Sequence, residues 1–179
     1  MKYYVVADIH GYYDLMVQAL MGKGYFTDTE PHKLIICGDL FDRDKQSKKM
    51  QEFVVERLQK DEVILIRGNH EDLLADFVEK LPAYAETGLQ YCHHYANGTV
   101  QTVRDLTGST ITKMSMYPGA IAAGMRRSGI FKTILPAMKN YFETKNYIFV
   151  HGWIPAIANG VGAGRIILNM IPTGAVLIA

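Results

Sequence analysis

The chain has 179 residues, of which 49% are apolar and 21% charged, and its formal net charge is +1. This length suits a single domain (residues 1–179) that buries about two-thirds of its unfolded surface. The charge balance gives no broad electrostatic basis for binding nucleic acid or a membrane, and no apolar run approaches the roughly 18 residues of a membrane span. Two cysteines make no disulfide framework, and a strand pattern starts at once instead of a signal peptide. We therefore expect a cytoplasmic protein, with its oligomeric state left open.

The first 80 residues alternate between strand and helix patterns. Short apolar, β-branched runs at 3–7, 33–37 and 62–66 predict buried strands. The stretches between them, 12–22 and 47–59, carry apolar residues at helical spacing. This β-α-β-α-β order predicts an α/β fold with a parallel sheet and right-handed crossovers.

The middle of the chain, residues 71–143, has a different character. Helical patterns at 72–81, 100–106 and 129–142 are broken by Gly, Pro and Asn, which predicts a helical cap or insertion. A strand pattern then returns at 147–150.

The end of the chain, residues 156–179, is atypical in composition. After His151 the only charged side chain is Arg165, and Gly, Ala, Ile, Asn and Pro make up much of the rest. One interpretation is a buried C-terminal strand or two. The other is a truncated or frame-shifted end, in which the last strands are incomplete.

Polar residues follow the predicted strands at the point where each strand ends: Asp8 and His10 after the first, Asp39 after the second, Asn69 and His70 after the third, and His151 after the late one. The carboxyl ends of parallel strands meet in one crevice, so we expect these side chains to lie together. Carboxylate, imidazole and amide oxygen suit first-row divalent metals. Two ions about 3.5–4 Å apart can share a carboxylate, clamp a phosphate and generate hydroxide at neutral pH. Hydrolysis of a phosphate ester is the favoured reaction.

Other residues complete this chemistry. Arg43 and Arg67 are placed to match the charge of a phosphate through bidentate contacts. His70 can protonate the leaving alkoxide, and Asp42 can orient its imidazole. The adjacent pair His93–His94 lies in the helical middle, and we interpret it as surface or packing rather than as a metal site.

Four segments together carry a family resemblance: Gly38-Asp39-Leu40-Phe41-Asp42-Arg43, Arg67-Gly68-Asn69-His70-Glu71, Asn97-Gly98-Thr99 with Thr102, and His151-Gly152. Over residues 3–155 the chain resembles the calcineurin-like metallophosphoesterases of the phosphoprotein phosphatase branch. It is most similar to phage and bacterial serine/threonine protein phosphatases and their diadenosine tetraphosphatase relatives. The fold that this resemblance implies is a four-layer α/β/β/α sandwich.

The resemblance also implies a role for each site residue. Asp8 and His10 would hold the first metal, Asp39 would bridge both metals, and Asn69 and His151 would hold the second. His70, paired with Asp42, would be the general acid, and Arg43 and Arg67 would bind phosphate. The bridging hydroxide would attack phosphorus in line. Two divalent ions are implied, with manganese as the activating metal and iron or zinc as alternatives.

Three functions remain open from the sequence. The first is a serine/threonine protein phosphatase, and the second a hydrolase of dinucleoside tetraphosphates, so that the substrate is a phosphoprotein or a phosphorylated small molecule. The third is a C-terminally altered, weakly active or inactive domain that binds metal or phosphate. The family supplies a further metal-binding His after the His-Gly motif, and no His follows His151 in this chain.

Overall fold

A computed structural model describes residues 1–152, 166–168 and 177–178. Its first sheet has the order β3-β2-β1-β7. Three parallel strands form its body: β1 (Lys2–Ala7), β2 (His32–Cys37) and β3 (Val63–Ile66). The short strand β7 (Leu177–Ile178) pairs antiparallel with β1. The three strands predicted from β-branched apolar runs are therefore present, within a residue or two of their predicted bounds.

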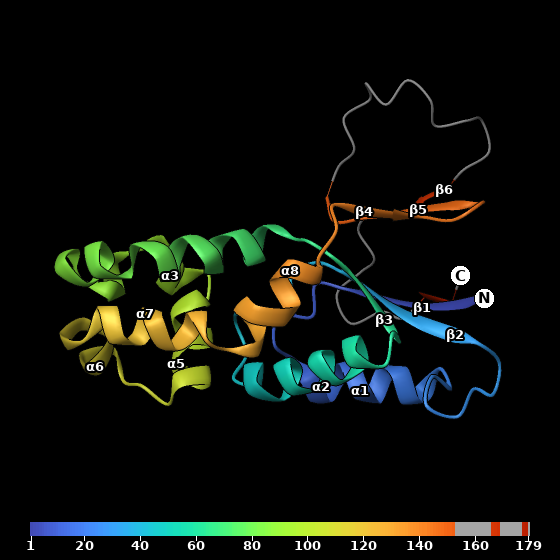
Figure 1. Cartoon of the computed structure of the whole chain (residues 1–179), viewed down its shortest axis with the longest axis horizontal. Coiled ribbons are helices and arrows are strands. Elements are labelled where there is room, and N and C mark those ends of the chain that lie inside the picture. Colours follow the sequence, from blue (N-terminus) through green and yellow to red (C-terminus); the bar gives the residue numbers. More distant parts are fainter. Residues whose placement is uncertain (153–165, 169–176, 179) are drawn as a thin grey trace, which may run out of the picture.

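A second sheet lies over one face of the first (Figure 1). It consists of β4 (Tyr141–Glu143), β5 (Tyr147–Val150) and β6 (Ile166–Leu168), with β4 antiparallel and β6 parallel to β5. Side chains alternate along a strand, so β1 turns Val5 and Ala7 toward this sheet, where they cluster with Phe149. The strand that the sequence predicts at 147–150 is confirmed.

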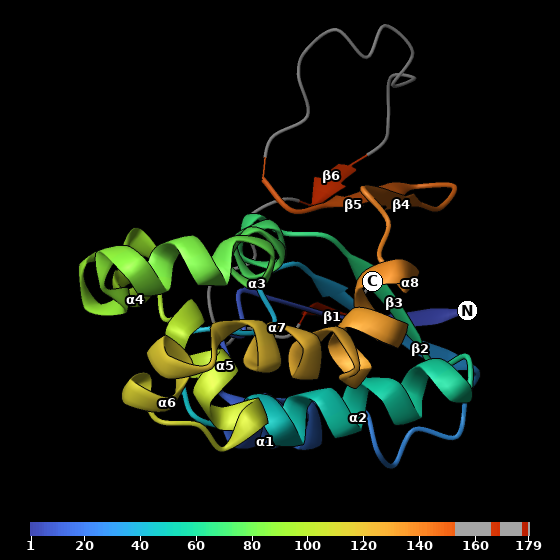
Figure 2. The same ribbon diagram turned by 60° about the vertical axis from the view of Figure 1, so that its left-hand side comes forward.

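Helices α1 (Tyr13–Gly22) and α2 (Ser47–Gln59) cover the other face of the first sheet (Figures 1 and 2). The opposite set of strand residues packs there, so that Tyr4 and Val6 join Leu20 and Phe53 in the larger core. These elements make three layers of the predicted sandwich, namely helices, sheet and sheet. The predicted second helical layer, beyond the second sheet, is not among the described residues.

The middle of the chain is helical and gathers beyond the carboxyl ends of β1–β3 (Figure 1). Its elements are α3 (Asn69–Thr87), the 3₁₀ turn η1 (Leu89–Tyr91), α4 (His93–Ala96), α5 (Thr99–Thr107), α6 (Ile111–Met116), α7 (Pro118–Arg126), the π-helical turn η2 (Ile130–Ile134) and α8 (Leu135–Ala137). Buried residues of these helices, including Leu81, Val103 and Met125, belong to the same core cluster as the sheet. The insertion therefore rests on the strand ends where the candidate site lies.

Two predicted helices need correction. The helix expected at 72–81 runs from Asn69 to Thr87 and contains Pro82. The helix expected at 129–142 is wrong beyond residue 137, because the chain pairs with β3 there: the Lys139 N–H donates to the Leu65 carbonyl at 2.9 Å. The chain then enters β4, so that Phe142 lies in a strand.

Two sequence predictions concern the atypical C-terminal segment and membrane-spanning helices. The tail contributes β6 and β7, and the other residues of the atypical segment 156–179 lie outside the described residues. Among the helices that the structure describes, none is long and apolar enough to cross a bilayer.

Candidate metal centre

The turns that follow β1 and β2 adopt unusual backbone geometry. Six non-glycine residues of the described chain have positive φ, and five of them lie in these two turns: Asp8, His10, Asp39, Asp42 and Arg43, with φ between 50° and 73°. Such residues cost free energy and persist where the surrounding structure holds them, typically at functional sites. The strand ends thus turn sharply enough to direct successive polar side chains into one crevice.

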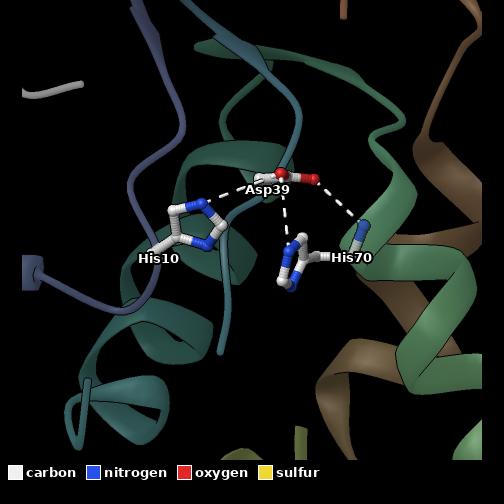
Figure 3. Close-up of side chains that lie close together, drawn as sticks. All are labelled: His10, Asp39 and His70. Carbon is white, nitrogen blue, oxygen red and sulfur yellow. Dashed lines mark hydrogen bonds and ion pairs between the residues drawn. The ribbon is translucent and has the colours of Figure 1, made fainter. Parts of the chain in front are cut away.

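Asp39 lies at the centre of this crevice (Figure 3). Its Oδ2 is 3.8 Å from His10 Nε2 and 4.0 Å from His70 Nε2. Its Oδ1 is 3.4 Å from His151 Nε2 and accepts a hydrogen bond from the His70 backbone N–H at 3.0 Å. One carboxylate therefore faces imidazole nitrogens on both sides.

Two candidate ligand groups share Asp39. One comprises His10, Asp39 and His70, and the other Asp8, Asp39 and His151. Asn69 Oδ1 lies 3.1 Å from His151 Nε2, so it belongs beside the second group. Asp8 and His10, which the resemblance assigns to the same ion, fall in two groups that meet at Asp39. Their assignment to one ion stays a prediction.

The other ring nitrogens of two histidines point at backbone carbonyls. His151 Nδ1 lies 3.0 Å from the Cys37 carbonyl, and His10 Nδ1 lies 3.3 Å from the Phe41 carbonyl. A proton on each Nδ1 leaves the Nε2 lone pair free for a metal, and such second contacts orient metal-binding histidines. Burial, aided by the charge of Arg43, lowers the pKa of His10, which favours the neutral ligand form.

His70 and Asp42 form a buried pair. His70 Nδ1 lies 2.8 Å from Asp42 Oδ2, which also accepts a hydrogen bond from the Thr99 hydroxyl at 2.8 Å. Thr102 donates to Asp42 Oδ1 at 2.7 Å. The hydrogen bond to Asp42 raises the pKa of His70, so its Nε2, which faces Asp39, tends to carry a proton.

Glu71 supports the backbone of the site, a role that the sequence did not predict. It is the last residue of the motif Arg67-Gly68-Asn69-His70-Glu71. It is fully buried, and its carboxylate accepts three backbone N–H groups: from Gly68 at 2.8 Å, Leu40 at 2.9 Å and Asp39 at 3.0 Å. Burial raises the pKa of this carboxyl, while the three donors act against that rise. Glu71 thus ties the turn after β2 to the start of α3.

Two glycines leave room for the side chains of the site. A Cβ on Gly68 would lie 2.3 Å from Asp39 Oδ1, and one on Gly38 would lie 2.4 Å from His151 Nδ1. Any larger residue would push the candidate ligands out of place. Close backbone approach is therefore part of how the crevice is built.

A family model described as calcineurin-like phosphoesterase matches residues 1–168. The chain belongs to the calcineurin-like phosphoesterase family. The resemblance that the sequence motifs carry is thereby confirmed. The family hydrolyses phosphoesters with divalent metals, which agrees with the candidate ligand groups around Asp39.

Two curated relatives of this calcineurin-like phosphoesterase are named bis(5'-nucleosyl)-tetraphosphatase PrpE (asymmetrical). They come from Bacillus velezensis and Bacillus subtilis, and each is 31% identical over 96 residues. The match covers 50% of this chain and 39% of each relative. The chain thus matches about two fifths of their length.

Among the solved structures that match this chain, the first supports the fold. A mutant of a cold-active protein tyrosine phosphatase superposes with a TM-score of 0.55 at 20% identity, covering 86% of this chain and 42% of that one. A protein serine/threonine phosphatase from Saccharomyces cerevisiae gives a TM-score of 0.47 at 17% identity, covering 87% of this chain and 39% of that one.

The two arginines predicted to bind phosphate differ in their surroundings. Arg67 Nε donates to Asp72 Oδ1 at 2.7 Å, so its guanidinium is already paired. Arg43 is exposed and has no ion-pair partner within the described chain. Its charge influences both His10 and His70. Of the two predicted phosphate-binding arginines, Arg43 is therefore the one without an ion pair to a described residue.

A further group of candidate ligands lies in the insertion, away from this crevice: Asp76, His93 and His94. His94 is fully buried, with its ring 5.0 Å from Phe77 and 4.9 Å from Tyr84, and its Nε2 lies 3.2 Å from Asp76 Oδ2. His93 is exposed. These contacts fit the interpretation of His93–His94 as packing and surface.

Proposed function

We propose that this chain is a metal-dependent phosphoester hydrolase that holds two divalent ions, with manganese as the activating metal. Its ligands would be Asp8 and His10 for one ion, Asn69 and His151 for the other, and Asp39 for both. The observation that supports this most is the Asp39 carboxylate, whose two oxygens face imidazole nitrogens on opposite sides. A bridging ligand needs this placement, and the donor set of carboxylate, imidazole and amide oxygen suits first-row divalent ions.

Ions held there would supply the Lewis acidity that activates water and offsets the charge of the phosphate. The chain's own residues would do the rest. Arg43 binds the non-bridging phosphate oxygens, which share the negative charge of the transition state. As the bond from water oxygen to phosphorus forms and the bond to the leaving oxygen breaks, His70 gives its Nε2 proton to that oxygen. Asp42 keeps the other proton on Nδ1 and so fixes the direction of the ring.

Two substrate classes fit this core. The motifs around Asp39 and Asn69 resemble the phosphoprotein phosphatase branch, which favours phosphoserine and phosphothreonine in proteins. The names of the two Bacillus relatives favour dinucleoside tetraphosphates. We keep the phosphoprotein as the first candidate and the dinucleotide as the second.

The test is hydrolysis of para-nitrophenyl phosphate by the purified chain, with and without manganese, together with calorimetric titration of manganese. Asp39→Asn removes the shared charge, so turnover should fall by about 100-fold or more and metal affinity should fall with it. Asp61→Asn is the matched control, since Asp61 also has a positive φ (55°, against 53° for Asp39) but is not among the candidate ligands. This control should behave as the wild type.

A folded wild-type chain that binds manganese without turnover would support the third function left open by the sequence, an inactive metal-binding domain. A folded chain that neither binds manganese nor turns over substrate would contradict the proposal altogether.

A further inference from the structure

A basic pocket adjoins the candidate metal centre on the side of Arg43. Its volume is about 390 Å³, and its walls come from the turn after β2, from the end of α4 and from α5. The lining includes Arg43, Lys45, Tyr95, Gly98, Gln101 and Arg104. No carboxylate is among the described residues that line the pocket.

Within the part of the chain that the structure describes, the three cations of this pocket lack acidic partners. Arg43, Lys45 and Arg104 take part in none of the ion pairs recorded within residues 1–152. Arg104 donates from Nη1 to Gln101 Oε1 at 3.2 Å, and its buried Nε has no hydrogen-bond partner in the described chain. Unpaired cations around one hollow repel one another unless an anion joins them.

In a second cavity, by contrast, the cationic side chain is paired with a carboxylate. It is lined by Arg57, Glu30 and Glu62, and Arg57 is paired with Glu62. The Arg57 charge in that cavity is paired within the protein, whereas the charges beside Arg43 are not paired with any carboxylate of the described residues.

The wall of the basic pocket is fixed directly to the candidate metal centre. Gly98 packs so closely on the turn that a Cβ there would lie 2.2 Å from the Arg43 backbone nitrogen. Thr99 and Thr102, in the first turns of α5, hold the carboxylate of Asp42. A ligand in the pocket would therefore be held in register with the metal centre, and Arg43 lies where the two meet.

We propose that this pocket is a subsite for the non-scissile phosphates of a polyphosphate substrate, such as a dinucleoside polyphosphate; this rests on the proposed hydrolase function. A simple phosphomonoester offers charge only at the reacting phosphate and needs only Arg43. A polyphosphate chain carries negative charge on each successive phosphate, which Lys45 and Arg104 match. Tyr95, a lining residue that is 48% exposed, offers a ring on which a base can stack.

The test compares three substrates with one double variant. Lys45→Gln with Arg104→Gln removes two pocket charges and leaves Arg43 in place. We expect kcat/KM for diadenosine tetraphosphate to fall at least about tenfold relative to kcat/KM for para-nitrophenyl phosphate. Lys23→Gln with Arg126→Gln is the matched control, because it removes the same charge from exposed positions outside the pocket. The control should keep the wild-type ratio.

A ratio that stays within twofold of wild type would overturn the proposal. The third substrate, a phosphopeptide with acidic residues beside its phosphoserine, separates the two anionic sources. If its kcat/KM falls as far as that of the dinucleotide, the pocket recognises acidic peptide and the polyphosphate assignment is wrong.

A binding measurement tests the pocket independently of whether the chain is a hydrolase. Inorganic tripolyphosphate is titrated calorimetrically into the metal-free chain, so no turnover is needed. The pocket variant should bind it at least about tenfold more weakly than the control variant, with a shallower dependence on salt. If the wild type lacks phosphatase activity but shows this difference, the hydrolase proposal fails and the pocket stands as a polyphosphate-binding site; equal binding by the two variants overturns the pocket proposal itself.

Discussion

The Thr102 hydroxyl makes two hydrogen bonds to Asp42: it accepts one from the Asp42 backbone N–H at 2.9 Å and donates one to Asp42 Oδ1 at 2.7 Å. Both residues are fully buried. Asp42 in turn holds His70 Nδ1, so a helix of the insertion fixes the candidate general acid through one intermediate carboxylate. Thr102 is a positioning residue in this arrangement.

Thr102→Val should therefore lower both stability and turnover. The substitution keeps the shape of the side chain but leaves a buried N–H and a buried carboxylate oxygen without their partner, which should cost about 2–4 kcal/mol in the free energy of unfolding. We expect kcat to fall about tenfold or more while KM changes little, because His70 loses its fixed orientation. Urea unfolding and steady-state kinetics measure the two effects.

Two companion variants separate positioning from general damage. Thr102→Ser keeps the hydroxyl and should restore most of kcat. Thr107→Val lies in the same helix, but Thr107 donates only to the Val103 carbonyl, so its effect on stability should be within about 0.5 kcal/mol. A Thr102→Val protein with wild-type kcat would show that the orientation of Asp42 does not depend on this contact.

Glu71→Gln is expected to loosen the turn that carries Asp39. The carboxylate accepts three backbone N–H groups, and an amide replaces one of its two acceptor oxygens with a donor. At least one buried N–H then loses its partner, at a cost of about 1–3 kcal/mol. Because one of these groups belongs to Asp39, manganese affinity should also fall, which calorimetry on the folded variant can measure.

The matched control for this variant is Glu52→Gln, an exposed position on α2. It makes the same chemical change where water replaces any lost contact. Unchanged stability and metal affinity in Glu71→Gln would mean that the buried carboxylate does not hold the turn.

The sequence predicted the ends of the strands better than the contacts made across the chain. Runs such as 33–37 and 147–150 carry their own signal, because buried strands need β-branched apolar residues wherever they pair. The polar residues after them follow from position alone, which is why Asp39, His70 and His151 could be expected in one crevice.

The remaining contacts join distant segments, and spacing does not encode them. Thr102 meets Asp42 across 60 residues, and Glu71 meets Leu40 across 31. The chain near Lys139 leaves its helical pattern because it hydrogen-bonds to Leu65 of β3. At Lys139, tertiary pairing thus overrides the local helical pattern.

Because Gly98 packs closely on Arg43, we expect an alanine at Gly98 to destabilise the protein more than an alanine at Gly108. Gly98 and Gly108 flank α5, and both have positive φ, 89° and 64°. A Cβ on Gly98 would lie 2.2 Å from the Arg43 nitrogen, whereas one on Gly108 would meet nothing within 4 Å. Gly108→Ala should cost only the backbone strain of about 1 kcal/mol.

Gly98→Ala must in addition move the turn that carries Asp42 and Arg43. We expect it to cost at least about 2 kcal/mol more than Gly108→Ala and to lower kcat/KM for para-nitrophenyl phosphate, which Gly108→Ala should not. Equal stability of the two variants would contradict the packing of α5 on this turn.

We expect the buried ring of His94 to make the free energy of unfolding depend on pH. Its ring is fully buried, its Nδ1 has no hydrogen-bond partner in the described chain, and burial together with the charge of His93 lowers its pKa. As pH falls through the ordinary value of about 6.5, the unfolded chain takes up a proton at His94 before the folded chain does. The free energy of unfolding should therefore fall in this window, by up to about 1.4 kcal/mol per pH unit from this group.

Urea unfolding in EDTA at pH 7.5 and pH 5.5 measures this loss, and the change between the two pH values is the quantity to compare. His94→Gln lacks the titrating ring, so its stability should fall less over this range than that of the wild type, even if it is less stable at both pH values. A His94→Gln protein that loses as much stability on acidification as the wild type would show that the buried ring accepts its proton as readily as an unfolded one.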